Sequence, residues 1–209
     1  DILSDFVQNH RIEYVSKYAE KASEREMDFV AGFCMHILSR VLDKFLTLQP
    51  IGRRHALTRL FLYRFEQAHR RCVDKGVNPT TFTIDMLEYK IESMKDPKER
   101  LEFGGYVVDA YAEMGKYSIR KGFFDDILSW RANALYLIKN CPELAGMAVD
   151  VLEEALRSLK SRTSREDKVR YSWAHEALDT LHRESHGHRQ INRRIGMLLK
   201  VFPRPRHRR

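Results

Sequence analysis

The chain has 209 residues, with 37 lysine and arginine residues against 29 aspartate and glutamate residues, and it carries a formal charge of +8. The whole surplus lies in residues 182–209, which hold nine basic residues and one acidic residue, so residues 1–181 are neutral. A neutral body with a cationic extension excludes a uniformly basic, histone-like protein. A hydrophobic fraction of 43% excludes a wholly disordered one.

Cysteine is sparse, and its pattern argues against a disulfide framework. The chain has three cysteines, Cys34, Cys72 and Cys141, and no CxxC motif. We therefore expect an intracellular, reducing compartment, such as the cytoplasm or an organelle matrix. The chain begins at Asp1, which leaves room for a targeting segment upstream.

Start and stop signals divide the chain into helices. Capping residues that can accept a hydrogen bond from free N–H groups precede several apolar-periodic segments, and glycines follow them. Alternating strand patterns with tight turns are absent. The starts are Ser23, Asp96 and Ser164, and the stops are Gly76, Gly122 and Gly187.

These signals predict an all-α fold of eight or nine antiparallel helices, stacked as helical hairpins in a solenoid-like array or a compact helical bundle. We divide the chain into a helical-hairpin domain, residues 1–187, and a C-terminal extension, residues 188–209. The predicted helices span residues 2–22, 24–49, 52–75, 80–95, 97–121, 123–140, 142–162, 165–186 and 189–201.

The helix predicted at 52–75 is locally basic, with seven basic and two acidic residues in 53–75. Phe61, Tyr63 and Phe65 are interleaved with its arginines. Arginine beside an exposed aromatic ring suits phosphate contact with base stacking. The favoured interpretation is that the aromatic rings form core and the arginines pair with the acidic segment 85–113.

The junction that follows, residues 66–87, resembles the boundary between two pentatricopeptide repeats. Gly76, Pro79, Thr83 and Leu87 fall in register with that pattern, although Ile84 replaces its aromatic residue. The resemblance implies binding of single-stranded RNA. It also implies that the residue at the polar position, Asp85, contacts a base.

A second segment is similar to one tetratricopeptide unit, in which small residues let two antiparallel helices approach closely. The alternative to both resemblances is a generic stack of helical hairpins, because neither pattern recurs in register. The matching residues are Tyr111, Met114, Gly115, Gly122, Phe124, Ile127 and Ala134.

The helix predicted at 165–186 carries three histidines and one aspartate within a stripe about 60° wide. These are ligand types suited to zinc or iron, but one straight helix cannot close a tetrahedron, so a site would need His188 or His69 as well. The favoured interpretation is a solvated polar face, which needs no cofactor. The four residues are His175, Asp179, His182 and His186.

The last predicted helix, 189–201, is cationic and amphipathic, with Ile191, Ile195, Leu198 and Leu199 on one side. Such a helix can lie on an anionic membrane, dock in a partner's groove, or pack on its own domain with its arginines outward. The arm after it, 203–209, holds two prolines that keep it extended. Its arginines suit contact with a phosphate backbone.

No P-loop, GxGxxG, GxSxG or HExxH motif occurs, so we expect a non-enzymatic binding module, part of a larger assembly, that docks on RNA or a ribonucleoprotein through the cationic arm. One alternative is a protein–protein scaffold, in which the hairpin stack offers a concave, tetratricopeptide-like groove and the tail recognises an acidic protein or an anionic membrane. The other is a metal-dependent helical enzyme. The predicted contact residues are Arg189, Arg193, Arg194, Lys200, Arg204, Arg206, Arg208, Arg209, Arg53, Arg64 and Arg71.

Overall fold

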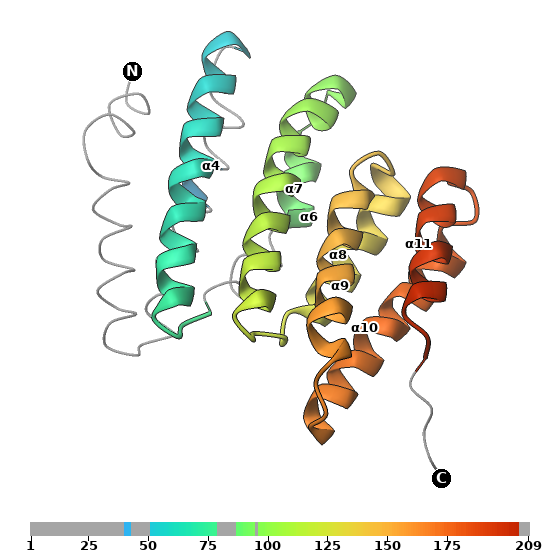
Figure 1. Cartoon of the computed structure of the whole chain (residues 1–209). Coiled ribbons are helices and arrows are strands. Elements are labelled where there is room, and N and C mark those ends of the chain that lie inside the picture. The colour runs from blue at the N-terminus through green and yellow to red at the C-terminus, as the bar shows by residue number, and fades with distance from the viewer. Residues whose placement is uncertain (1–39, 43–50, 79–86, 95, 205–209) are drawn as a thin grey trace. The chain divides into compact units, whose positions relative to one another are not determined.

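The computed structural model describes residues 40–42, 51–78, 87–94 and 96–204, and of residues 51–55 it describes the backbone alone. The regular structure in these ranges is helical throughout, and none of it is a strand (Figure 1). The all-α prediction is therefore confirmed.

The described helices follow the predicted spans closely at most ends. Residues 123–126 and 141–144 are short links between helices, so two helices begin three to four residues later than predicted. The predicted helices 2–22 and 24–49 lie outside the described residues, except that 40–42 are helical. The helices are α4 (Ile51–Asp74), α6 (Leu87–Ser93), α7 (Pro97–Arg120), α8 (Ile127–Asn140), α9 (Ala145–Lys160), α10 (Arg165–Glu184) and α11 (Arg189–Val201).

Two of the predicted helix starts are confirmed by their hydrogen bonds. The Ser164 hydroxyl accepts a bond of 3.0 Å from the Asp167 backbone N–H. The Asp96 carboxylate accepts bonds from the N–H groups of Lys98 and Glu99, at 2.7 and 3.2 Å. Each cap satisfies N–H groups that the first helical turn leaves without an intrahelical partner. The third predicted start, Ser23, lies outside the described residues.

The predicted stops at Gly76 and Gly122 are also confirmed, because both glycines adopt the left-handed backbone conformation, with φ of +86° and +98°. That conformation ends a helix and suits glycine, which has no Cβ to clash. At the third predicted stop, α10 ends at Glu184 with Ser185 as its C-cap, and Gly187 follows without a left-handed φ.

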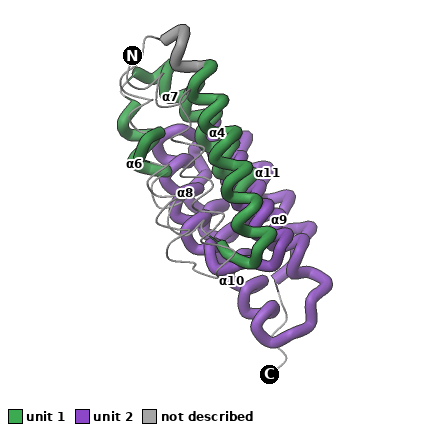
Figure 2. Tube along the Cα trace, turned by 90° about the vertical axis from the view of Figure 1, so that its left-hand side faces the viewer, with its two compact units in different colours: residues 1–114 green, residues 115–209 purple. Residues whose placement is uncertain are grey.

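The chain divides into two compact units, residues 1–114 and residues 115–209, with the boundary inside α7 (Figure 2). The predicted division after residue 187 does not coincide with this boundary. The reason is that α11 belongs to the second unit, where it packs on α10 and on α9.

In the first unit, aromatic side chains of α4 and α7 form core. The rings of Phe61 and Phe65 stack with their centroids 6.0 Å apart, and Phe65 lies 5.7 Å from the ring of Tyr111. All three side chains are buried. Phe61 and Phe65 therefore lie in the core, as predicted, whereas Tyr63, which was predicted as core with them, is 56% exposed.

In the second unit, α8, α9 and α10 pack against one another (Figure 1). The apolar face predicted for α9 is buried along its length, from Ala148 to Leu159. At Gly115 in α7, a Cβ atom would lie 2.6 Å from the indole nitrogen of the buried Trp130 in α8. Only glycine fits there without a shift of the indole ring. Among the described helices, none is both long enough and apolar enough to cross a membrane.

Candidate nucleic-acid interface

The apolar side of α11 is buried against its own unit. Ile191, Ile195 and Leu198 are buried, and so is Phe202, which follows the helix in line. Of the three arrangements that the amphipathic pattern allowed, the structure shows the third, in which the helix packs on its own domain. The apolar side chains that a membrane-lying helix would insert into lipid are therefore already covered.

Arg194 fastens α11 to α9. Its guanidinium donates a hydrogen bond of 3.2 Å to the backbone oxygen of Gly146 and forms an ion pair with Asp150. A second carboxylate, that of Glu153, lies 3.7 Å away. Partial burial lowers the pKa of Arg194, but its ordinary value is so far above 7 that the group stays charged. Arg194, predicted as a contact for an anionic partner, thus faces inward and holds the helix in place.

On the α10 side, Asn192 and Gly196 fix the position of α11. The Asn192 amide donates to the backbone oxygen of His182, at 2.7 Å, and to the Ser185 hydroxyl, at 3.0 Å. A Cβ at Gly196 would lie 3.0 Å from the His182 ring nitrogen. Helix α11 therefore has a defined rotation about its axis, and this rotation decides which of its side chains face solvent.

The basic residues that face outward are Arg189, Arg193 and Lys200. All three are exposed, and none forms an ion pair with any residue that the structure describes. At 100° per residue they fall within about 40° of one another, roughly opposite the buried isoleucines. A rise of 1.5 Å per residue spreads them over about 16 Å. We call these three residues the outer stripe of α11.

The start of the C-terminal arm is attached to α10. The Tyr171 hydroxyl donates to the backbone oxygen of Pro203, at 3.2 Å. The Phe202 side chain is buried, and the Lys160 ammonium of α9 lies 5.6 Å from the centre of its ring. The arm therefore leaves the domain at a fixed place, with Arg204 exposed there. The remaining predicted contacts of the arm, Arg206, Arg208 and Arg209, lie outside the described residues.

The predicted metal ligands are not brought together, and one of them, His186, lies beyond the end of α10 at Glu184. Among the described residues, no group of three or more His, Cys, Asp or Glu side chains is placed to hold a metal ion. His175 is buried beneath the arm, where burial lowers its pKa despite the nearby Asp179 carboxylate. His182 and His186 lie edge to face, with ring centroids 5.9 Å apart. The two further predicted ligands belong to no such group either: His188 is the N-cap residue of α11, and His69 is buried in the first unit.

Some basic residues of α4 already contact other side chains of the first unit. Arg59 lies over the ring of Tyr106, 5.5 Å from its centre, and Arg70 pairs with Glu66 at 2.5 Å. The exposed basic side chains of α4 include those of Arg64 and Arg71, and Tyr63 is 56% exposed. The structure does not describe the side chain of Arg53 or any part of Asp85. The predicted contact between Asp85 and an RNA base therefore stays a prediction.

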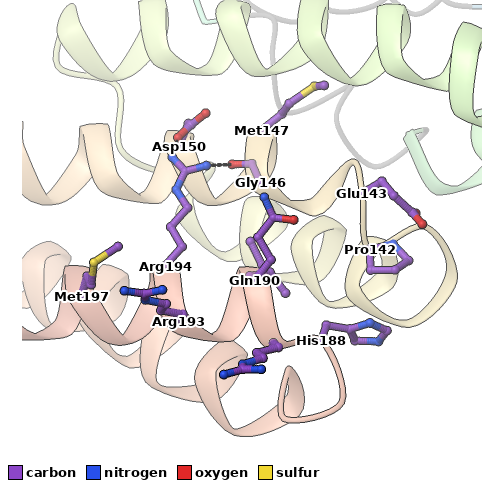
Figure 3. A pocket seen from close by; sticks show the side chains of 12 residues that line it. Pro142, Glu143, Gly146, Met147, Asp150, His188, Gln190, Arg193, Arg194 and Met197 are labelled. Carbon is purple, nitrogen blue, oxygen red and sulfur yellow. Dashed lines mark hydrogen bonds and ion pairs between the residues drawn. The ribbon is translucent and has the colours of Figure 1, made fainter.

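A groove between α9 and α11 was not predicted from the sequence. It has a volume of about 1100 Å³, and Figure 3 shows the side chains that line it. Arg194 crosses it to reach Gly146. No periodicity in the sequence could have revealed it, because the lining residues of its two walls lie at least 38 residues apart in the chain. The lining residues are Pro142, Glu143, Gly146, Met147, Asp150, His188, Arg189, Gln190, Ile191, Arg193, Arg194 and Met197.

Comparison with known proteins finds no matching family model, no matching curated protein and no matching solved structure.

Proposed function

We propose that the chain is a non-enzymatic helical module that docks on RNA, free or within a ribonucleoprotein, through the outer stripe of α11 and the C-terminal arm. The observation that carries the proposal is the orientation of α11. Because its apolar side is buried, Arg189, Arg193 and Lys200 all face solvent from one side of the helix.

The chemistry of these residues suits a phosphate backbone. Arginine guanidinium groups donate hydrogen bonds to phosphate oxygens in a forked geometry, and release of counterions from the nucleic acid adds to the affinity. The arm extends this surface by four more arginines, of which Arg204 leaves the domain beside α10. The two prolines of the arm, Pro203 and Pro205, favour an extended chain that can follow a single strand.

The competing anionic surface, a membrane, is disfavoured by the same packing. A peripheral helix binds a bilayer by inserting its apolar side below the headgroups. In α11 that side consists of Ile191, Ile195 and Leu198, which are buried in the domain. Exposing them would cost the energy of their packing on α10.

Deletion of residues 203–209 tests the proposal. We expect the affinity for a single-stranded oligoribonucleotide to fall at least tenfold at physiological salt. The dependence of affinity on salt should also flatten, because the deletion removes four arginines that contact phosphates. Fluorescence anisotropy at several salt concentrations measures both quantities.

The matched control is Tyr171→Phe, which removes the hydrogen bond to Pro203 and keeps every charge of the arm. We expect this variant to bind RNA with a salt dependence close to that of the unchanged chain. An unchanged affinity and salt dependence after the deletion would refute the proposal for the arm.

A further inference from the structure

The groove between α9 and α11 has an apolar lining that the rest of the domain does not cover. Met197 in α11 is 54% exposed, and Met147 in α9 lines the opposite wall. Pro142 and the buried Ile191 add further apolar surface. Methionine side chains are flexible and polarisable, so they adapt to the apolar side chains of a partner.

The charges of the groove are divided unequally between its walls. On the α9 wall, the Asp150 carboxylate is already paired with Arg194. The other acidic side chain of this wall is that of Glu143, in the link before α9. On the α11 wall, Arg189 and Arg193 have no ion pair with a described residue. The wall formed by α11 therefore presents an uncompensated positive edge beside an apolar lining.

We propose that this groove binds an acidic, amphipathic peptide segment of a protein partner. Apolar side chains of the segment lie against Met147 and Met197, and its carboxylates pair with Arg189 and Arg193. An amphipathic helix laid between two helices makes this kind of contact, with apolar anchors at i, i+3, i+4 and i+7. This inference goes beyond RNA binding and does not depend on it, although Arg189 and Arg193 would serve both partners.

The full chain with ¹³C-labelled methionine methyl groups provides the test. Two designed peptides serve as probes: an amphipathic helix with leucines at i, i+3, i+4 and i+7 and glutamates elsewhere, and the same peptide with lysines in place of the glutamates. We expect the acidic peptide to shift the methyl resonances of Met147 and Met197, and the basic peptide to leave them in place.

Met197→Glu should weaken binding of the acidic peptide about tenfold or more, because it places a carboxylate within the apolar lining and beside the carboxylates of the ligand. The matched control is Leu128→Glu in α8, which changes a similarly exposed apolar residue outside the groove. The control should bind the acidic peptide normally.

Three results would overturn the inference. The first is that neither peptide shifts the two methionine resonances. The second is that the basic peptide shifts them equally. The third is that a single-stranded oligoribonucleotide shifts them and the acidic peptide does not, in which case the groove belongs to the RNA surface. Met197→Glu leaves the arm intact, and deletion of 203–209 leaves the groove intact, so failure of one proposal is distinguishable from failure of the other.

Discussion

Gly115→Ala is expected to lower the free energy of unfolding by about 2 kcal/mol. A Cβ atom at this position would lie 2.6–2.7 Å from three atoms of the Trp130 indole, which is fully buried. Forcing an extra methyl group into a packed core costs about 1–3 kcal/mol, and occasionally more. The better helix propensity of alanine offsets at most about 1 kcal/mol of that cost. Urea denaturation measures the difference.

Gly187→Ala is the matched control, because no atom lies within 4 Å of its would-be Cβ and its backbone is not left-handed. Its stability should stay within about 0.5 kcal/mol of the unchanged chain. In a double-mutant cycle, Trp130→Phe should relieve the clash, so that the two substitutions are coupled favourably by about 1 kcal/mol or more. Additive effects would show that the two residues do not meet.

Acidification from pH 8 to pH 5 is expected to lower the stability of the first unit by about 2 kcal/mol through His69 alone. Complete burial, with a smaller contribution from the charge of Arg70, lowers the pKa of His69 from 6.5 to about 3. At pH 5 the unfolded chain therefore binds a proton at this residue and the folded chain does not, which favours unfolding. The contribution of His69 to stability is complete above pH 6.5 and declines as the pH falls toward about 3.

His69→Gln should remove this part of the pH dependence, since glutamine does not titrate. His186→Gln changes an exposed histidine and should keep the full loss between pH 8 and pH 5. A direct measurement on the unchanged chain is the NMR titration of the His69 ring, which should remain neutral at pH 5. A ring that takes up its proton near pH 6.5 would contradict the burial described for α4.

The sequence predicted the helices well because their limits depend on local chemistry. The caps at Asp96 and Ser164 and the glycines at 76 and 122 act within one turn, so their signals can be read in a few consecutive residues. The bounds of α11 agree with the prediction at both ends for the same reason. Whether the hairpins belong to the tetratricopeptide or pentatricopeptide families stays a prediction.

The roles of individual side chains were harder to predict, because they depend on contacts between distant segments. Arg193 and Arg194 are adjacent in an apparently uniform cationic helix, yet Arg194 pairs with Asp150, 44 residues earlier, and Arg193 faces solvent. Similarly, three histidines share one predicted stripe, but His175 is buried and His186 is exposed beyond the end of α10. Helical periodicity locates a residue on a face and does not say what covers that face.

The most direct test of the central claim, that α11 presents an outer cationic stripe to RNA, compares Arg193→Ala with Arg194→Ala. Both remove one positive charge from adjacent positions. Arg193→Ala should leave thermal stability unchanged and reduce the slope of log affinity against log salt by about 0.7, the value for one phosphate contact on a single strand. Arg194→Ala should lower thermal stability, because it breaks the contacts with Asp150 and Gly146, and should leave the slope unchanged. Two results would contradict the proposed orientation of the binding surface. One is that both variants have the same slope of log affinity against log salt, and the other is that only Arg194→Ala reduces it.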